Sequence, residues 1–257
     1  MSEVGLDPRL VIIERRLSSI SNILAFVSSK GGVGKTLLSV LVAAELSRRG
    51  FKVGLLDLDV TNPTAHIVLG VDVEEVEPEE EKGIIPPEVS GIKFMSIAYY
   101  SGENPVPLRG DEVASVIREV LAITRWGNLE YLIVDMPPGM GDELLEMITY
   151  IKRSLLILVT TPSVLSLASA RRLAKLVEGK GRLMGIIENM SDTQTELVVE
   201  LANEIKATYL GNVPYVPMLE ELMGKPYEML NTPVGEAISR AVNLLEQSIK
   251  QTKGYYH

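Results

Sequence analysis

The sequence predicts an α/β fold, a single-domain, doubly wound and mostly parallel sheet with helices on both faces. Short apolar runs rich in β-branched residues alternate along the chain with longer segments of helical period. Most of the apolar runs also lack polar alternation, as expected for strands buried on both faces of a parallel sheet. Such a sheet has right-handed crossovers and binds ligands at the carboxyl ends of its strands.

Each apolar run indicates one strand, and each periodic segment indicates one helix. The predicted strands are residues 23–29, 52–59, 92–97, 130–136, 155–161, 182–189 and 207–213. The predicted helices are residues 35–50, 111–124, 142–153 and 161–181. In the last of these helices, Ser163 is a suitable N-cap and Gly179 a suitable stop. The Glu-rich residues 71–83 are predicted to form a solvated loop.

The C-terminal segment from Val234 to His257 has apolar residues at helical spacing and few charges of either sign. A membrane-surface anchor would be a basic amphipathic helix, so this pattern favours a final helix that docks on the domain. The expected domain therefore spans residues 23–251, with an N-terminal helical extension at 1–22 and a tail at 252–257.

Composition narrows the classes of function. The chain has 257 residues, 46% of them hydrophobic, and a net charge of −9. Nucleic acid binding over the whole surface is therefore not expected, although a local basic patch stays possible. No apolar run approaches the roughly 20 residues of a membrane span, and the amino terminus is unlike a secretory signal, so we expect a cytoplasmic protein. A count of 0 cysteines and 2 histidines excludes disulfides and leaves almost nothing to ligate zinc or an iron–sulfur cluster.

The stretch SKGGVGKT, residues 29–36, has the pattern of a phosphate-binding loop between a strand and a helix. Its glycines let several backbone N–H groups face one phosphate, and the helix that follows adds its positive end. Lys35 is expected to reach the terminal phosphates, and Thr36 to offer its hydroxyl to Mg²⁺. Ser29 stands where the full pattern has glycine, but the strand–loop–helix context supports a nucleotide site.

Two further predicted strands end in carboxylates. Asp135 precedes the turn formed by Pro137, Pro138 and Gly139, which suits the metal-positioning acid of a phosphate loop. Asp57 and Asp59 end another strand and lie on one side of it, because side chains alternate with period two. One of this pair could contact Mg²⁺ or its waters and the other the attacking water. Alternatively, Asp57 only caps the turn that follows.

These stretches carry a family resemblance. SKGGVGKT, with its additional Lys30, resembles the deviant Walker A signature of the MinD/ParA/NifH class of P-loop ATPases. DLDVTNPTAHIVLG resembles the switch segment of the Mrp (ApbC-like) family, and WGNLEYLIVDMPPGMGDELL, VTTPS and GIIENMS match further Mrp blocks in the right order. The resemblance runs from about Ile23 to Ala241. It implies a MinD/ParA-like P-loop fold and an ATPase that uses ATP and Mg²⁺.

The resemblance also implies roles for individual residues. The nucleotide phosphates would be bound by Lys30, Gly31, Gly32, Val33, Gly34, Lys35 and Thr36, with Leu37 beside them. Asn189 would read the adenine edge, although a turn role stays open, and Pro217 lies in the loop that would close over the base. The implied Mg²⁺ ligands are Thr36, Asp59 and Asp135, and the implied catalytic residues are Lys30, Lys35 and Asp59, which would position the hydrolytic water. Arg109 matches a family arginine that would contact a partner subunit, a phosphate or an ordinary salt-bridge partner.

Lys30 is the residue that points to a second subunit. In this class two subunits face each other across the nucleotides, and each sends its signature lysine to the phosphates of the other. Phosphoryl transfer needs positive charge on the phosphate oxygens, so a charge from a partner makes hydrolysis depend on homodimerisation. The alternative is that Lys30 lies near the phosphates of its own subunit.

The sequence departs from the family after the ENMS block. The family has a C-P-x-C pair there, whereas residues 188–206 contain no cysteine. Because iron–sulfur clusters need soft thiolate ligands, no self-supplied cluster is expected, although partners could supply one.

Three functions follow from these observations. The favoured one is an Mrp-like ATPase that dimerises, hydrolyses ATP slowly, and uses this cycle to bind and release a protein client or an iron–sulfur-assembly partner. The alternative is a ParA/MinD-like positioning ATPase that binds DNA or membrane in its ATP state. A small-molecule kinase or ligase on the same loop would need an acceptor pocket that no motif identifies.

Overall fold

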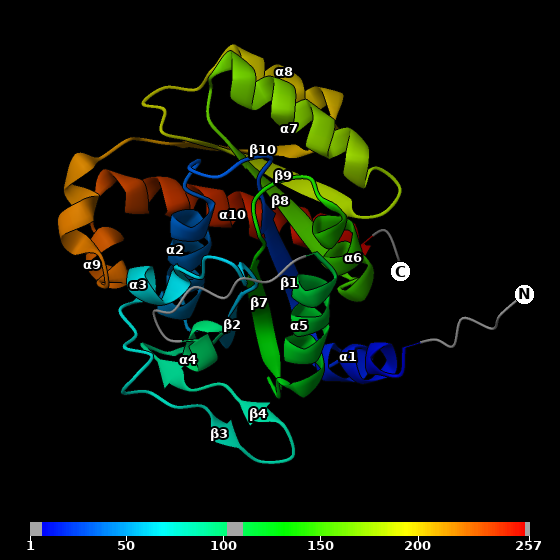
Figure 1. Cartoon of the computed structure of the whole chain (residues 1–257). Helices are drawn as coiled ribbons and strands as arrows, with labels where there is room; N and C mark the ends of the chain where they lie inside the picture. Colours follow the sequence, from blue (N-terminus) through cyan, green and yellow to red (C-terminus); the bar gives the residue numbers. More distant parts are fainter. Residues whose placement is uncertain (1–6, 102–109, 255–257) are drawn as a thin grey trace, which may run out of the picture.

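A computed structural model describes residues 7–101 and 110–254 of the chain. Its core is an 8-stranded sheet with the order β10-β9-β8-β1-β7-β2-β6-β5 (Figure 1). The strands of this sheet are β1 Ile20–Val27, β2 Val53–Asp57, β5 Glu88–Val89, β6 Ile92–Ser96, β7 Leu129–Asp135, β8 Ser154–Thr160, β9 Arg182–Asn189 and β10 Thr208–Val213. The short edge strand β5 runs antiparallel to β6, and the other neighbouring strands are parallel. The predicted fold class is confirmed, and all seven predicted strands are present.

Two layers of helices cover the sheet because its strands alternate their apolar side chains between two cores. In β1, Leu24 and Phe26 join one core, while Ile23, Ala25 and Val27 join the other. The first core is covered by α2 Lys35–Arg48, α3 Ala65–Leu69, α9 Pro226–Met229 and α10 Pro233–Gly254. The second is covered by α1 Arg9–Leu17, α5 Gly110–Ile123, α6 Asp142–Tyr150, α7 Val164–Val177 and α8 Glu196–Glu204. Shorter elements are α4 Ala98–Ser101 and the 3₁₀ helix η1 Pro217–Leu222.

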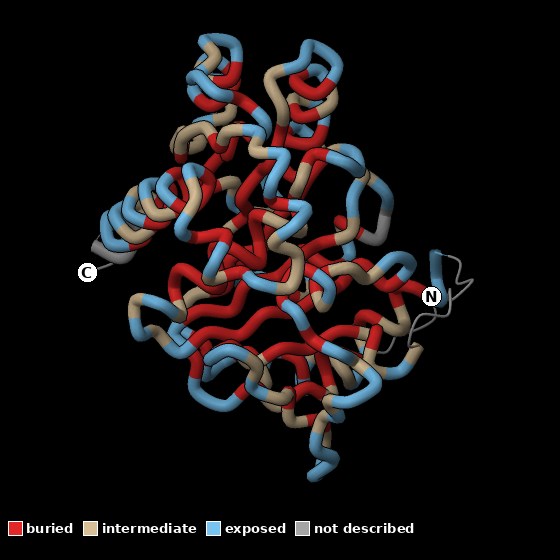
Figure 2. Tube along the Cα trace, turned by 90° about the vertical axis from the view of Figure 1, so that its left-hand side faces the viewer, coloured by how far each residue is buried: buried red, intermediate tan, exposed pale blue. Residues whose placement is uncertain are grey.

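The strands are buried on both faces, as their continuous apolar runs predict. All residues of β2 are buried, and in Figure 2 exposure is concentrated on the loops and the outer sides of the helices. Ser163 accepts a hydrogen bond from the Ser166 amide at 3.2 Å, which confirms it as the N-cap of α7. Gly179 follows the end of α7 with a φ of +74°, the left-handed conformation that suits a helix stop.

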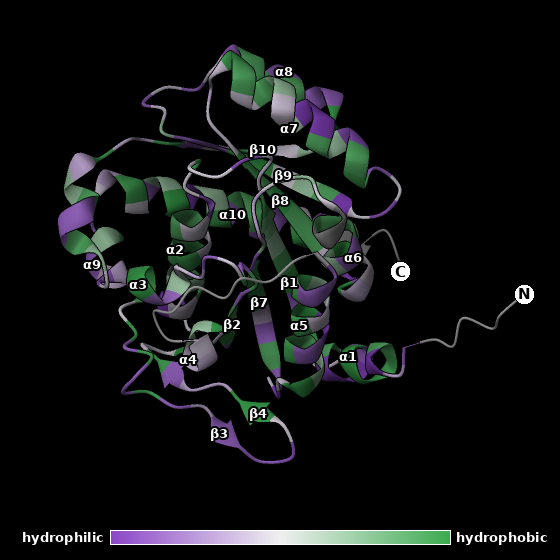
Figure 3. Ribbon diagram, viewed as in Figure 1, coloured by the Kyte–Doolittle hydropathy of each residue, from purple (hydrophilic) through white to green (hydrophobic). Residues whose placement is uncertain are grey.

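Two predictions of local structure need correction. The Glu-rich residues 71–83 are mostly exposed, but they also contain the two-residue strand β3 Glu79–Glu80, which pairs with β4 Ile84–Ile85. The pairing forms because Ile84 is buried in the domain core and a turn at Lys82 and Gly83 returns the chain; Figure 3 shows a hydrophilic β3 beside a hydrophobic β4. The helix predicted at 142–153 ends at Tyr150, because β8 already begins at Ser154.

The last helix docks on the domain, as its apolar spacing predicts. Its residues Val234, Ile238, Ala241, Val242, Leu245 and Ile249 are all buried. Helix α10 packs against α2 and β10, and Arg49 at the end of α2 donates hydrogen bonds to Asn243 and Glu246 of α10. No helix within residues 7–101 and 110–254 is long and apolar enough to cross a membrane.

The strand order creates a crevice at the carboxyl edge of the sheet. Strand β1 lies between β7 and β8, and it connects through α2 to β2 on the far side of β7. Strand β7 connects through α6 to β8 on the far side of β1. The chain thus leaves these two neighbouring strands in opposite directions, and ligands of doubly wound sheets bind at such a switch point.

Candidate nucleotide site

The loop between β1 and α2 forms an open cradle at this switch point. A Cβ atom placed on Gly31 or Gly32 would meet no atom within 4 Å. Gly34 caps α2 with a φ of +81°, and a Cβ there would lie 2.2 Å from Asn189 Nδ2. Glycine is therefore required at position 34 by both backbone conformation and contact, and the loop leaves space for a ligand beside the N-terminus of α2.

Lys35, Thr36 and Asp135 form one cluster beneath this loop. Lys35 Nζ lies 2.5 Å from Asp135 Oδ1, and Thr36 Oγ1 donates to Asp135 Oδ2 at 2.7 Å. The side chains of Lys35 and Asp135 are 5% and 0% exposed, so this ion pair is buried. The cluster joins the start of α2 to the end of β7 and offers hydroxyl and carboxylate oxygens, the donor set that suits Mg²⁺.

Asp57 and Asp59 lie beside this cluster but have different surroundings. Asp57 is buried and accepts hydrogen bonds from the amides of Asp59 and Ala65 and from the Ser96 hydroxyl. Its burial, reinforced by the nearby Asp135 charge, raises the pKa of Asp57 to about 7. Asp57 thus bonds to the amides of the segment after β2, whereas the turn at Thr61 and Asn62 is bonded by Asp59.

Asp59 is held at the rim of the same site. Its Oδ1 accepts hydrogen bonds from the Thr61 hydroxyl and the Asn62 amide, each at 3.2 Å. Burial raises the pKa of Asp59, while the positive charge of Lys35 opposes this rise. The carboxylate is therefore fixed near Lys35 and Asp135 by its own loop.

Lys30 contrasts with Lys35 although both lie in the same loop. The Lys30 side chain is exposed and forms no hydrogen bond or ion pair with any residue in the described part of the chain. Only its backbone carbonyl is used, as the acceptor of a 3.0 Å hydrogen bond from the Ser28 hydroxyl. The Lys30 ammonium group is thus available on the surface of the loop.

A pocket of about 100 Å³ adjoins the loop at the end of β9. Asn189 and Pro217, the two residues implied at the base, both line it, together with Leu37 and with Tyr215 from the segment after β10. Asn189 Nδ2 donates to the Val33 carbonyl at 2.8 Å, which ties the pocket to the phosphate loop. The pocket is therefore placed where a base could lie beside bound phosphates.

Some residues at the site were not found from the sequence. Met190 lines the pocket with a φ of +58°, an uncommon conformation for a residue with a side chain. The Ser28 carbonyl accepts a 2.9 Å hydrogen bond from the Gly139 amide, which attaches the turn after β7 to the phosphate loop. Ser96 contacts Asp57 from β6. Single serines carry no pattern, but Met190 directly follows the predicted Asn189.

The structure thus brings together the predicted loop residues, Thr36, Asp59, Asp135 and the residues of the base pocket. Their roles in binding and catalysis stay predictions at this point. Arg109 lies outside the described residues.

Comparison with known proteins identifies the family to which the chain belongs. A family model described as ParA, NUBPL iron-transfer P-loop NTPase, matches residues 19–249. The iron-sulfur cluster carrier protein of Aquifex aeolicus is 34% identical over 226 residues, which cover 82% of this chain and 62% of that protein. The iron-sulfur cluster carrier protein of Pyrococcus horikoshii is 31% identical over an alignment of 278 residues, gaps included, which covers 98% of this chain and 94% of that protein.

Solved structures resemble the fold. A nucleotide-binding protein of Archaeoglobus fulgidus in complex with ADP has a TM-score of 0.71 and 28% identity, covering 88% of this chain and 94% of its own. The MinD cell division protein of Aquifex aeolicus has a TM-score of 0.60 and 20% identity, covering 88% of this chain and 97% of its own, and this likeness shows the fold alone. The family match over residues 19–249 confirms the resemblance inferred from the motifs: the chain belongs to the ParA family of NUBPL-type iron-transfer P-loop NTPases.

Proposed function

We propose that this P-loop NTPase is a slow ATPase whose nucleotide cycle controls its dimerisation and its binding to a protein client or an iron–sulfur-assembly partner. The observation that carries the proposal is the buried Lys35–Asp135 pair, bridged to Thr36 under an open glycine cradle. The adjoining pocket at Asn189 supports an adenine nucleotide as the ligand, because it offers a polar edge beside apolar walls.

The phosphates would be held by two kinds of positive charge. The backbone N–H groups of residues 31–36 and the N-terminus of α2 would face the phosphate oxygens, and Lys35 would reach them from below. Mg²⁺, held by Thr36 and Asp135 with Asp59 near its waters, would neutralise charge on the phosphates.

Asp59 is proposed to orient the attacking water. Its hydrogen bonds to Thr61 and Asn62 fix the carboxylate, and its place beside Lys35 keeps it next to the phosphate site. A water aligned in this way loses little freedom on the way to the transition state, which is how a positioned carboxylate accelerates hydrolysis.

Lys30 is proposed to complete the site of a second copy of the chain. Its exposed side chain has no partner among the described residues, whereas Lys35 is buried beside Asp135 in the site of its own subunit. A charge supplied only on association makes hydrolysis depend on the dimer.

The proposed binding of an iron–sulfur-assembly partner rests on the family and on the amino-acid composition. The relatives of Aquifex aeolicus and Pyrococcus horikoshii are named iron-sulfur cluster carrier proteins. This chain spans 62% of the first of them and contains 0 cysteines, so thiolate ligands for a cluster would have to come from partners. A MinD-like membrane role has less support, because the apolar face of α10 is buried in the domain.

The substitution Lys30→Ala tests the dimer mechanism. The variant is expected to bind ATP with nearly unchanged affinity but to lose ATP-dependent dimerisation and hydrolysis, because only the trans charge is removed. Light scattering with Mg²⁺–ATP and a phosphate-release assay measure these properties. Lys180→Ala, which removes an exposed lysine at the end of α7, is the matched control. A Lys30→Ala monomer that hydrolyses ATP at the wild-type rate would refute the mechanism.

A second experiment tests the supply of a cluster. Purified chain is mixed with a cluster donor, with and without proteins that co-purify with the ATP-locked Asp59→Ala variant. Visible absorbance is expected only in a complex. A stable cluster on the isolated chain would contradict the ligand argument.

A further inference from the structure

A second hollow lies at the opposite edge of the sheet, where the strands begin. It has a volume of about 390 Å³ and is bounded by α1, β4, β6 and the segment between α5 and β7. Figure 1 shows α1 and β4 on the lower side of the molecule, near the ends of α5 and β7. Its charged lining consists of Arg15, Arg16, Lys93 and Arg125. Four cations thus surround one hollow in a chain whose net charge is −9.

Two of these cations are fixed by backbone carbonyls alone. Arg16 donates to the carbonyls of Ala122 and Lys82, each at 3.2 Å. Lys93 donates to the Trp126 carbonyl at 3.0 Å. Because carbonyls are neutral acceptors, these bonds orient the side chains without cancelling their charge.

The remaining two cations differ in their partners. Arg125 donates to the Glu81 carbonyl and also forms a 3.1 Å ion pair with the Glu81 carboxylate, whose side chain is 67% exposed. Arg15 is exposed, and its guanidinium has no hydrogen bond or ion pair with any residue that the structure describes. Most of the positive charge at the hollow is therefore left for a ligand.

Trp126 forms part of the wall of the hollow. The residue lines the hollow and is fully buried, with an exposed fraction of 0%, yet its Nε1 has no hydrogen-bond partner. An indole N–H can only donate, and a buried donor normally has an acceptor. Because the ring is closed to solvent, a ligand in the hollow would not reach this N–H, and Trp126 is a fluorescent reporter in the wall beside the cations.

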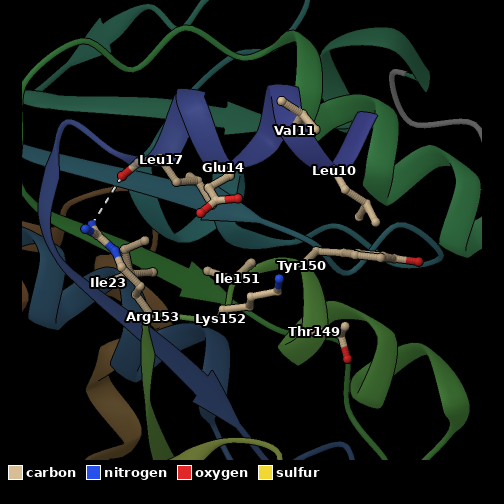
Figure 4. A pocket seen from close by; sticks show the side chains of 10 residues that line it. All are labelled: Leu10, Val11, Glu14, Leu17, Ile23, Thr149, Tyr150, Ile151, Lys152 and Arg153. Atoms are coloured by element: carbon tan, nitrogen blue, oxygen red, sulfur yellow. Dashed lines mark hydrogen bonds between the residues drawn. The ribbon is translucent and has the colours of Figure 1, made fainter. Parts of the chain in front are cut away.

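The neighbouring hollow on the other side of α1 has a different chemistry. As Figure 4 shows, apolar residues such as Leu17, Ile23 and Ile151 line it, and Glu14 adds a carboxylate opposite Lys152. None of its lining residues is among the described residues with a buried unpaired donor. Four cations therefore gather at the first hollow, whereas the second has Lys152 and Arg153 with the carboxylate of Glu14.

We propose that the hollow at Arg15, Lys93, Arg125 and Trp126 binds a small anion with two or more phosphate or carboxylate groups. All of its polar side chains can donate, so the ligand must accept. Its volume lies in the range of small-molecule sites and is too small for a macromolecule to enter. The site is separate from the phosphate loop, which lies at the other edge of the sheet.

The single tryptophan of the chain makes the test direct. Trp126 fluorescence is recorded while pyrophosphate or tricarballylate is added at constant ionic strength, with the phosphate loop saturated by Mg²⁺–ADP. A saturable change is expected with at least one probe. A response to pyrophosphate alone identifies a phosphate ligand, and a response to tricarballylate alone identifies a carboxylate ligand.

Two variants separate binding from general charge effects. Arg15→Gln is expected to weaken binding roughly tenfold, because one charge-assisted contact is lost. Arg172→Gln removes an equal charge from the exposed side of α7 and should bind like the wild type.

Three results would overturn the proposal. The first is a fluorescence change that follows NaCl as closely as it follows the probes. The second is equal weakening in Arg15→Gln and Arg172→Gln. The third is binding of a DNA duplex with neither small anion bound, which would indicate a macromolecular surface instead.

Discussion

Charged side chains lie at both ends of β7, but they are paired at one end and mostly unpaired by carboxylates at the other. At the carboxyl end, Asp135 neutralises the buried Lys35, and both side chains are almost inaccessible to solvent. At the amino end, Arg16 and Lys93 are half-buried and anchored by carbonyls, and Arg15 is exposed. A buried pair holds the loop in place and is costly to break, whereas exposed cations contribute little to stability.

This difference predicts which substitutions should lower the stability of the fold. Removing one member of the buried pair leaves an uncompensated charge inside the protein. Removing an exposed cation such as Lys30 or Arg15 leaves no charge uncompensated inside the protein. The comparison therefore predicts unequal losses of stability from chemically similar changes.

The largest effect is expected for Lys35→Ala. Asp135 would remain buried without its ion-pair partner, so the free energy of unfolding should fall by about 3 kcal/mol. Urea unfolding at neutral pH measures the loss. Lys30→Ala is the matched control, because it removes an exposed and unpaired lysine from the same loop. Equal losses in the two variants would show that the Lys35–Asp135 pair contributes nothing specific.

A smaller effect is expected at the amino end from Gly54→Ala. The new Cβ would lie 2.6 Å from Leu129 Cδ1 and 2.9 Å from the Trp126 ring, so the packed core must shift. Such overpacking should lower the free energy of unfolding by about 1–3 kcal/mol and change the Trp126 emission spectrum. Gly31→Ala, where a Cβ meets no atom within 4 Å, should unfold almost like the wild type. An unchanged emission spectrum in Gly54→Ala would mean that the indole does not pack there.

An effect of similar size concerns the pH dependence of stability. The pKa of Asp57 is about 7 in the folded protein against 3.8 for a free carboxyl, so the folded state holds this proton more tightly. Its contribution to stability is complete below the unfolded pKa and is lost as pH rises from about 4 to 7.

Asp57→Asn removes this titration. Between pH 4 and 7, the variant should gain about 1–3 kcal/mol relative to the wild type in the free energy of unfolding. Parallel denaturant titrations of the two proteins, without nucleotide or Mg²⁺, measure the difference. A constant difference across this range would show that Asp57 is not protonated in the folded protein.

The sequence predicted the structure best where the functional residues lie next to one another in the chain. Residues 29–36 lie together in the chain, and their glycine spacing has few interpretations, so the loop and the strand and helix around it were predictable. Asp135 was predictable because it ends an apolar run just before a proline turn. Asn189 and Pro217 came from the family resemblance alone, because no local pattern links them to Leu37.

The amino-edge hollow was not predictable from the sequence. Arg15 and Arg16, Lys93, and Arg125 come from three separate segments, and each looks like an ordinary surface residue in its own stretch. The sequence allowed only for a local basic patch. The strand β3 was missed for a similar reason, since Glu79 and Glu80 have low strand propensity and pair because Ile84 is buried opposite them.

The docking of α10 on α2 has a consequence for synthesis on the ribosome. Helix α2 begins at Lys35 and emerges early, whereas α10 begins at Pro233 and emerges after every strand of the sheet. Until then, the apolar side of α2 that packs on α10 is uncovered in the nascent chain. Exposed apolar surface of this kind is what chaperones bind. A chain that stalls before residue 233 would therefore keep this apolar side of α2 exposed, and a chaperone could bind it.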